Sequence, residues 1–113
     1  METKQLTPSA KALYDRISGI LSAAKAKKED AFIDDALQSA LMNMTTRDML
    51  DLEPPSIDKG VWTNDSAFCI RIGARIFGVS PESIEELPWQ YYMLFTQITA
   101  ANFLKSLGAV TRS

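Results

Sequence analysis

The sequence contains no histidine and a single cysteine, Cys69, among its 113 residues. One cysteine cannot form an intramolecular disulfide, and without histidine neither a Cys/His zinc site nor an imidazole-based catalytic triad can be assembled. Cys69 lies inside an apolar run, so we expect a buried thiol that packs as a small hydrophobic side chain. The sequence therefore predicts neither a bound metal ion nor a cofactor.

An excess of one charge sign and long apolar runs are also missing. Twelve Lys and Arg residues face 14 Asp and Glu residues, a formal net charge of −2, which argues against nucleic acid as a partner. No stretch approaches the roughly 18 apolar residues of a membrane span, and the first residues form no apolar signal segment. We therefore expect no membrane partner and a location in the cytoplasm.

Glycine is scarce as well, and the five glycines are scattered rather than gathered in a phosphate-binding loop. Acidic residues occur in pairs or clusters at Asp34/Asp35 and at Glu82/Glu85/Glu86, near the starts of predicted helices, where they favour the helix dipole. General acid–base catalysis needs a carboxyl group with a raised pKa, and the sequence offers no polar pocket partners for one. We expect no catalytic residue and no enzyme activity.

Helix signals recur along the chain and predict an all-α fold, a compact bundle of about five or six helices that ends in a long apolar helix. The length predicts one domain over residues 1–113, with frayed ends at 1–6 and 109–113. Thr7 and Pro8 provide an N-cap and a first helical position. Lysines at 25–28 then end this helix, and Glu29 and Asp30 begin the second.

A short third helix is predicted to start at Thr45 or Thr46 and to end before Pro54, followed by a loop over 53–63 that includes Val61 and Trp62. Residues 65–77 alternate with a period of two and also share a helical face. We favour a helix there because of its length, a cap at Asn64 or Asp65, and Gly78 at its end.

Ser80 and Pro81 predict a short fifth helix through Leu87. Pro88 then begins the longest helix, which we expect to run to about Ser106 and to stop at Gly108.

This last helix has no polar face. At 100° per residue, one apolar stripe contains Tyr91, Leu94, Phe95, Ile98 and Ala101, and a second contains Trp89, Met93, Ala100, Leu104 and Leu107, with Tyr92 and Phe103 close to it. Either the helix is internal to this chain, or one stripe meets the core and the other meets another chain. We favour the second interpretation, which makes the predicted partner-binding residues Trp89, Tyr92, Met93, Phe103, Leu104 and Leu107.

The segment from Ala74 through Gly78 and Val79 to Ile84 is similar to a helix-turn-helix. A small residue lets two helices approach closely, and glycine takes the turn conformation. The helix after this turn carries three glutamates and neither lysine nor arginine, and it is only about two turns long. We interpret the motif as packing; a DNA-binding regulator that uses Arg71 and Arg75 is an alternative function.

From Thr45 onward the chain resembles a tail assembly chaperone of long-tailed, lambda-like bacteriophages. The resemblance covers Thr45-Thr46-Arg47-Asp48-Met49-Leu50, the apolar segment 65–77, the run from Gly78 to Leu87 and the terminal helix 88–107. The chain differs from the family pattern at Trp89-Gln90-Tyr91, where aspartate is common, and at 7–44, where some members have strands.

The resemblance implies a non-catalytic protein that binds the tape measure protein and keeps it soluble until tail tube proteins polymerise around it. It also implies a homo-oligomer and an extended form of the same chain made by ribosomal frameshifting. Such a chaperone needs adaptable apolar surface, and Met42, Met44, Met49 and Met93 together with the second stripe are candidates. A small self-associating helical scaffold protein and a small enzyme are further alternatives.

Overall fold

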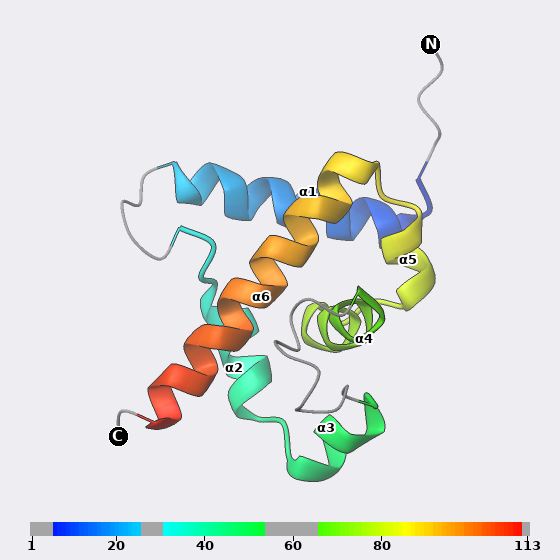
Figure 1. Ribbon diagram of the computed structural model, residues 1–113. Coiled ribbons are helices and arrows are strands. Elements are labelled where there is room, and N and C mark those ends of the chain that lie inside the picture. Colours follow the sequence, from blue (N-terminus) through cyan, green and yellow to red (C-terminus); the bar gives the residue numbers. More distant parts are fainter. Residues whose placement is uncertain (1–5, 26–30, 54–65, 112–113) are drawn as a thin grey trace.

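The computed structural model describes residues 6–25, 31–53 and 66–111, with side chains described as far as Leu107. These residues form six α-helices and no strand (Figure 1). In chain order the helices are α1 (Pro8–Ala24), α2 (Asp35–Met42), α3 (Thr46–Asp51), α4 (Ser66–Phe77), α5 (Pro81–Glu85) and α6 (Trp89–Thr111). The predicted all-α bundle ending in a long helix is confirmed, and the ambiguous segment is helical over its described residues, 66–77.

Several helices begin or end at the residues where the sequence predicts a boundary. Thr7 caps α1, since its hydroxyl accepts a hydrogen bond from the amide of Ala10, and Pro8 occupies the first position. Thr45 and Asp48 form a capping box at the start of α3, in which each side chain accepts from the other residue's backbone N–H. Gly78 ends α4 with a φ of 72°, in the left-handed region that glycine tolerates.

Three predicted boundaries are wrong. The second helix begins at Asp35 with Asp34 as its cap, and not at Glu29 and Asp30, because tertiary contacts hold residues 31–34 in a non-helical conformation. Gly108 does not stop α6, which continues to Thr111. Glycine inside a helix costs only about 1 kcal/mol, so it does not by itself terminate one.

The fifth helix is also shorter than predicted and ends at Glu85 instead of Leu87. Predictions for the loop 53–63 with Val61 and Trp62, the cap at Asn64 or Asp65, the charges at 27–30 and the frayed end at 1–6 lie wholly or mostly outside the described residues. Of the frayed end predicted at 109–113, residues 109–111 belong to α6 instead, and 112–113 lie outside the described residues.

The core lies between α6 and the helices that pack against one of its faces. Figure 1 shows α6 running diagonally across the molecule, with α1, α2 and α4 against it. The most deeply buried apolar side chains come from five helices: Leu13, Ile17, Leu37, Phe68, Ile72, Ile84, Phe95 and Ile98. Near the start of α6, Tyr91 stacks on Tyr14 of α1 with ring centroids 4.0 Å apart. One face of α6 is thus the centre of the fold.

The buried side-chain amide of Asn102, in α6, forms hydrogen bonds to the residues just before α2. The side-chain NH₂ of Asn102 donates to the carbonyls of Phe32 (2.9 Å) and Ile98 (2.8 Å). Its side-chain oxygen accepts from the amide of Asp34 and from the side chain of Gln38, both at 3.1 Å. Asn102 is 0% exposed and all of its side-chain hydrogen-bonding capacity is used. This network explains why the segment before Asp35 is not helical.

Candidate functional site

The second apolar stripe of the last helix lies at the surface of α6. We call it the outer stripe and define it as Trp89, Met93, Ala100, Leu104 and Leu107. Trp89 is 71% exposed, and Met93, Leu104 and Leu107 are 49%, 52% and 50% exposed, while Ala100 is half-buried. On the other side of the same helix, Phe95 and Ile98 are fully buried. One stripe of α6 therefore meets the core and the other faces outward from this chain.

Four of the six residues predicted to bind a partner lie together on this exposed surface, namely Trp89, Met93, Leu104 and Leu107. The other two do not. Tyr92 is half-buried and packs against the core. Phe103 is only 5% exposed, and its ring meets that of Phe68 edge-on with centroids 6.1 Å apart, because the helix turns it toward α4. Phe103 is thus mainly a core residue.

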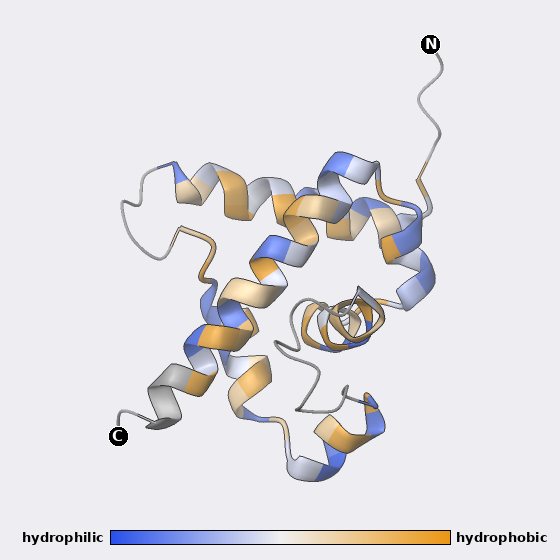
Figure 2. Cartoon of the chain, in the orientation of Figure 1, coloured by the Kyte–Doolittle hydropathy of each residue, from blue (hydrophilic) through white to orange (hydrophobic). Residues whose placement is uncertain are grey.

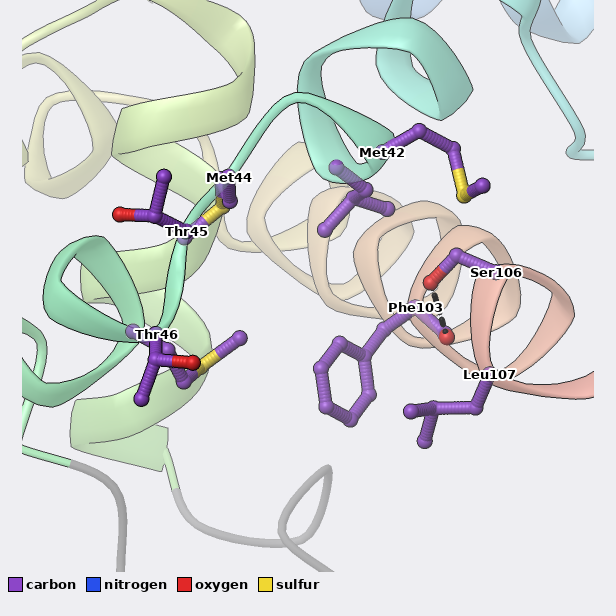
Figure 3. A pocket seen from close by; sticks show the side chains of 9 residues that line it. Met42, Met44, Thr45, Thr46, Phe103, Ser106 and Leu107 are labelled. Carbon is purple, nitrogen blue, oxygen red and sulfur yellow. Dashed lines mark hydrogen bonds between the residues drawn. The ribbon is translucent and has the colours of Figure 1, made fainter. Parts of the chain in front are cut away.

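An apolar hollow of about 300 Å³ adjoins the C-terminal half of α6. It is lined by Leu41, Met42, Met44, Thr45, Thr46, Met49, Phe103, Ser106 and Leu107. Figure 3 shows Phe103 and Leu107 extending from α6 toward the segment that carries Met44, Thr45 and Thr46. Because Leu107 belongs both to this wall and to the outer stripe, the hollow and the stripe form one apolar surface.

Three of the four methionines that the sequence suggested as adaptable surface line this hollow. Met42 is 56% exposed, and Met44 and Met49 are half-buried against the core. Met93 does not line it and lies nearer the start of α6, on the stripe. The residue type pointed to the methionines, but the sequence could not show that α2, α3 and the segment between them bring three of them to the same hollow as Phe103.

Helix α3, which forms one wall of the hollow, contains no buried residue. Two arginines of α4 hold it in place. Arg71 donates to the carbonyls of Leu52 and Glu53 at the end of α3, the second at 2.8 Å. Arg75 pairs with the carboxylate of Asp48 at 3.0 Å. Hydrogen bonds to the Thr45 amide and hydroxyl, together with Arg75, lower the pKa of Asp48.

The acidic residues that the sequence presents as catalytic candidates have structural partners or are exposed. Asp34 caps α2 and pairs with Arg16 at 3.3 Å. Glu86 accepts a hydrogen bond from the hydroxyl of Thr7, and Glu82 and Glu85 are exposed. Within the described ranges, no three His, Cys, Asp or Glu side chains are grouped so as to hold a metal ion.

The thiol of Cys69 is 2% exposed, as expected for a small hydrophobic side chain. Burial raises the pKa of Cys69 to about 11, so the thiol stays protonated at neutral pH. This side chain contributes to the core and is not a reactive nucleophile.

The helix-turn-helix segment forms two helices, α4 and α5, that pack against each other across the turn, as the spacing of Ala74 and Gly78 predicts. Ala74 is buried, and its carbonyl accepts from the amide of Val79 at 3.0 Å across the turn. The second helix of the motif, α5, has only five residues. Arg71 and Arg75, on which the DNA-binding alternative depends, donate to groups of α3 and of the residues that follow it, and Arg75 remains exposed.

No helix in the part of the chain that the structure describes combines the length and apolar character needed to cross a membrane. Comparison with known proteins adds no relative: no protein-family model, no curated protein and no solved structure matches this chain.

Proposed function

We propose that this chain is a non-catalytic chaperone whose outer stripe and adjoining hollow bind a long helical client protein. The observation that supports this function most directly is the outer stripe itself, where four large apolar side chains are each 49–71% exposed along one helix. Burying a large apolar side chain is worth about 1.5–3 kcal/mol, so a stripe that stays in water forgoes a substantial stabilisation. Contiguous apolar surface of this kind is typical of a protein-binding site.

The shape of the surface favours a helical client. From Trp89 to Leu107 the stripe extends about 27 Å at 1.5 Å per residue, which matches several turns of a second helix laid beside it. Amphipathic helices bind such surfaces through apolar side chains spaced three and four residues apart. The methionines of the hollow are flexible and polarizable, so they can accommodate different side chains of successive client segments.

The resemblance of residues 45–107 to phage tail assembly chaperones supplies the identity of the client in this proposal. The client is the tape measure protein, with the tail tube protein and an extended form of this chain as further partners, and the site of action is the cytoplasm of the host cell. The chain acts by covering apolar helix faces of the client, and no cofactor or catalytic group takes part.

Co-expression with a phage tape measure protein tests this proposal. We expect the chain to increase the soluble fraction of the tape measure protein and to co-purify with it. Met93→Glu combined with Leu104→Glu places two charges on the stripe, and both effects should be lost while the helical circular dichroism signal is kept. The matched control, Ala12→Glu with Ser22→Glu, adds the same charge at exposed positions of α1 and should behave as the wild type.

Two results would contradict the proposal. If the stripe variant still solubilises the tape measure protein, the stripe is not the client site. If the wild-type chain does not co-purify with the tape measure protein from phage-infected cells, the chaperone assignment itself is wrong. Salt-sensitive DNA binding that disappears in Arg71→Ala/Arg75→Ala would instead support the DNA-binding alternative.

A further inference from the structure

The walls of the hollow beside α6 are rich in sulfur and contain an aromatic ring. Met42, Met44, Met49 and Phe103 all line it, and among the described residues that line it none carries a charge. A carboxylate or an ammonium group would lose its hydration there without gaining a charged partner, so the hollow favours a neutral ligand. Thioethers and aromatic rings are favourable neighbours of another aromatic ring. An aromatic group therefore matches these walls better than an aliphatic one.

One buried hydroxyl of the hollow can still accept a hydrogen bond. Ser106 is buried, and its hydroxyl donates to the carbonyl of Phe103 at 2.7 Å, drawn as a dashed line in Figure 3. Because that bond uses the single hydroxyl proton, the Ser106 oxygen is left as an acceptor. A ligand that bonds to it must bring an O–H or N–H group, and a carbonyl group cannot replace this donor.

The size of the hollow suits one aromatic ring system. Its volume is about 300 Å³. A closed apolar cavity of about 150 Å³ is enough to hold benzene. A phenol or an indole group can thus enter the hollow with its donor directed at the Ser106 oxygen. Aromatic residues with a polar hydrogen are also frequent anchors of protein interfaces, because they bury a large apolar area and still form a hydrogen bond.

We propose that the hollow binds one neutral aromatic side chain that carries a hydrogen-bond donor, tyrosine or tryptophan, and that Ser106 selects it by accepting that bond. The inference rests on the proposed function, because the client helix supplies this side chain, which we call the aromatic anchor. Leu107 lines the hollow and also belongs to the outer stripe, so the aromatic anchor lies at one end of the bound client segment. The stripe then contacts about 18 residues of the client helix, from its length at 1.5 Å per residue.

Small aromatic probes test the hollow without any client. The tyrosine analogue para-cresol carries the donor, toluene lacks the hydroxyl, and para-methylanisole accepts a hydrogen bond but cannot donate one. We expect para-cresol to shift the methyl NMR signals of Met42, Met44 and Met49 saturably and to shift that of Met93, outside the hollow, far less. It should bind about two- to tenfold more tightly than the other two probes, the equivalent of one net hydrogen bond.

A single substitution tests the role of Ser106. Ser106→Ala removes the acceptor and leaves the other walls in place, so it should bind toluene as the wild type does and lose the preference for para-cresol. Unchanged toluene binding also shows that the variant keeps the hollow. The matched control, Ser22→Ala, removes a hydroxyl from an exposed position of α1 and should keep the preference.

Four results of these measurements would overturn the inference. Two concern the place of binding: no saturable shift at the three methionines of the hollow, or an equal shift at Met93. The other two concern the donor: equal affinities of the wild type for para-cresol and toluene, or an undiminished preference for para-cresol in Ser106→Ala.

A pair of peptides separates this inference from the proposed function. Both are amphipathic helices of about 18 residues, matched to the length of the stripe, and they differ only in carrying tyrosine or phenylalanine at both ends. The tyrosine peptide should bind the wild type about two- to tenfold more tightly, and Ser106→Ala should bind both equally. If the tape measure protein co-purifies but neither probes nor peptides show this preference, the inference alone is wrong. If para-cresol binds through Ser106 but the tape measure protein does not co-purify, the aromatic site is supported and the proposed function is wrong.

Discussion

Both faces of α6 are apolar, yet one is buried in the core and the other is exposed. The inner face carries Phe95, Ile98 and Asn102, each 0% exposed, whereas Trp89 and Leu104 on the outer stripe are 71% and 52% exposed. Hydropathy does not separate them, because large apolar side chains lie on both faces, and Figure 2 shows orange segments at intervals along the helix. The difference teaches that neighbouring helices, and not residue type, decide which stripe becomes core. The outer stripe is available for another protein because this chain does not cover it.

The sharpest contrast between the faces comes from removing one aromatic ring from each. Phe95→Ala should lower the free energy of unfolding by about 3–5 kcal/mol, because it leaves a cavity in the fully packed core. Trp89→Ala removes a larger ring from the exposed stripe and should change stability by less than about 0.5 kcal/mol. Urea denaturation followed by circular dichroism measures both. Equal losses in the two variants would mean that the faces do not differ in burial.

A second contrast compares two side-chain amides of α6, the buried one of Asn102 and the exposed one of Gln97. Asn102→Leu leaves the Phe32 carbonyl and the Asp34 amide without their partner, so we expect a loss of about 3 kcal/mol, since each unsatisfied buried group costs about 1–3 kcal/mol. Gln97 is exposed, and Gln97→Leu should be nearly neutral. Thermal unfolding of both variants at equal concentration checks this. A neutral Asn102→Leu would show that the network does not hold the entry of α2.

The smallest expected effects compare two helical glycines. A Cβ atom at Gly73 of α4 would lie 2.1 Å from the ring of Phe95, which is buried on the inner face. Gly73→Ala should therefore destabilise the chain by about 1–3 kcal/mol. Nothing lies within 4 Å of a Cβ atom at Gly19 of α1, so Gly19→Ala should stabilise by about 0.5–1 kcal/mol. The same substitution thus has opposite signs, and denaturant midpoints measure them; two midpoint shifts of the same sign would contradict the close contact at Gly73.

Local signals in the sequence predicted much of the fold. Thr7 with Pro8, the Thr45 capping box, and Gly78 each act through hydrogen bonds or backbone angles of neighbouring residues, so they can be recognised without the tertiary structure. The start of α2 could not be recognised from such local signals. Asp30 and Asp34 are equally good caps by residue type, and the choice between them depends on Asn102, 68 positions from Asp34.

The candidate site was predictable to a similar degree. Helical spacing identified the exposed stripe, including Met93 and Leu104, because a single helix fixes which residues share a face. It did not identify Phe103 as buried, since that depends on Phe68 of α4. The hollow was not predicted at all. It forms between α6 and the segments on either side of Thr45, and the distance between helices is not encoded in the period of any one of them.

The attachment of α3 has a consequence for how the chain opens. A helix of six residues with no buried side chain can contribute little to the free energy of global unfolding. Its capping box and its bonds to Arg71 and Arg75 lie at or near the surface, where water can replace them. Local unfolding of α3 therefore requires far less free energy than unfolding of the core. One wall of the methionine-lined hollow can thus detach while α1, α2, α4 and α6 stay folded, which makes the hollow an adjustable space instead of a rigid one.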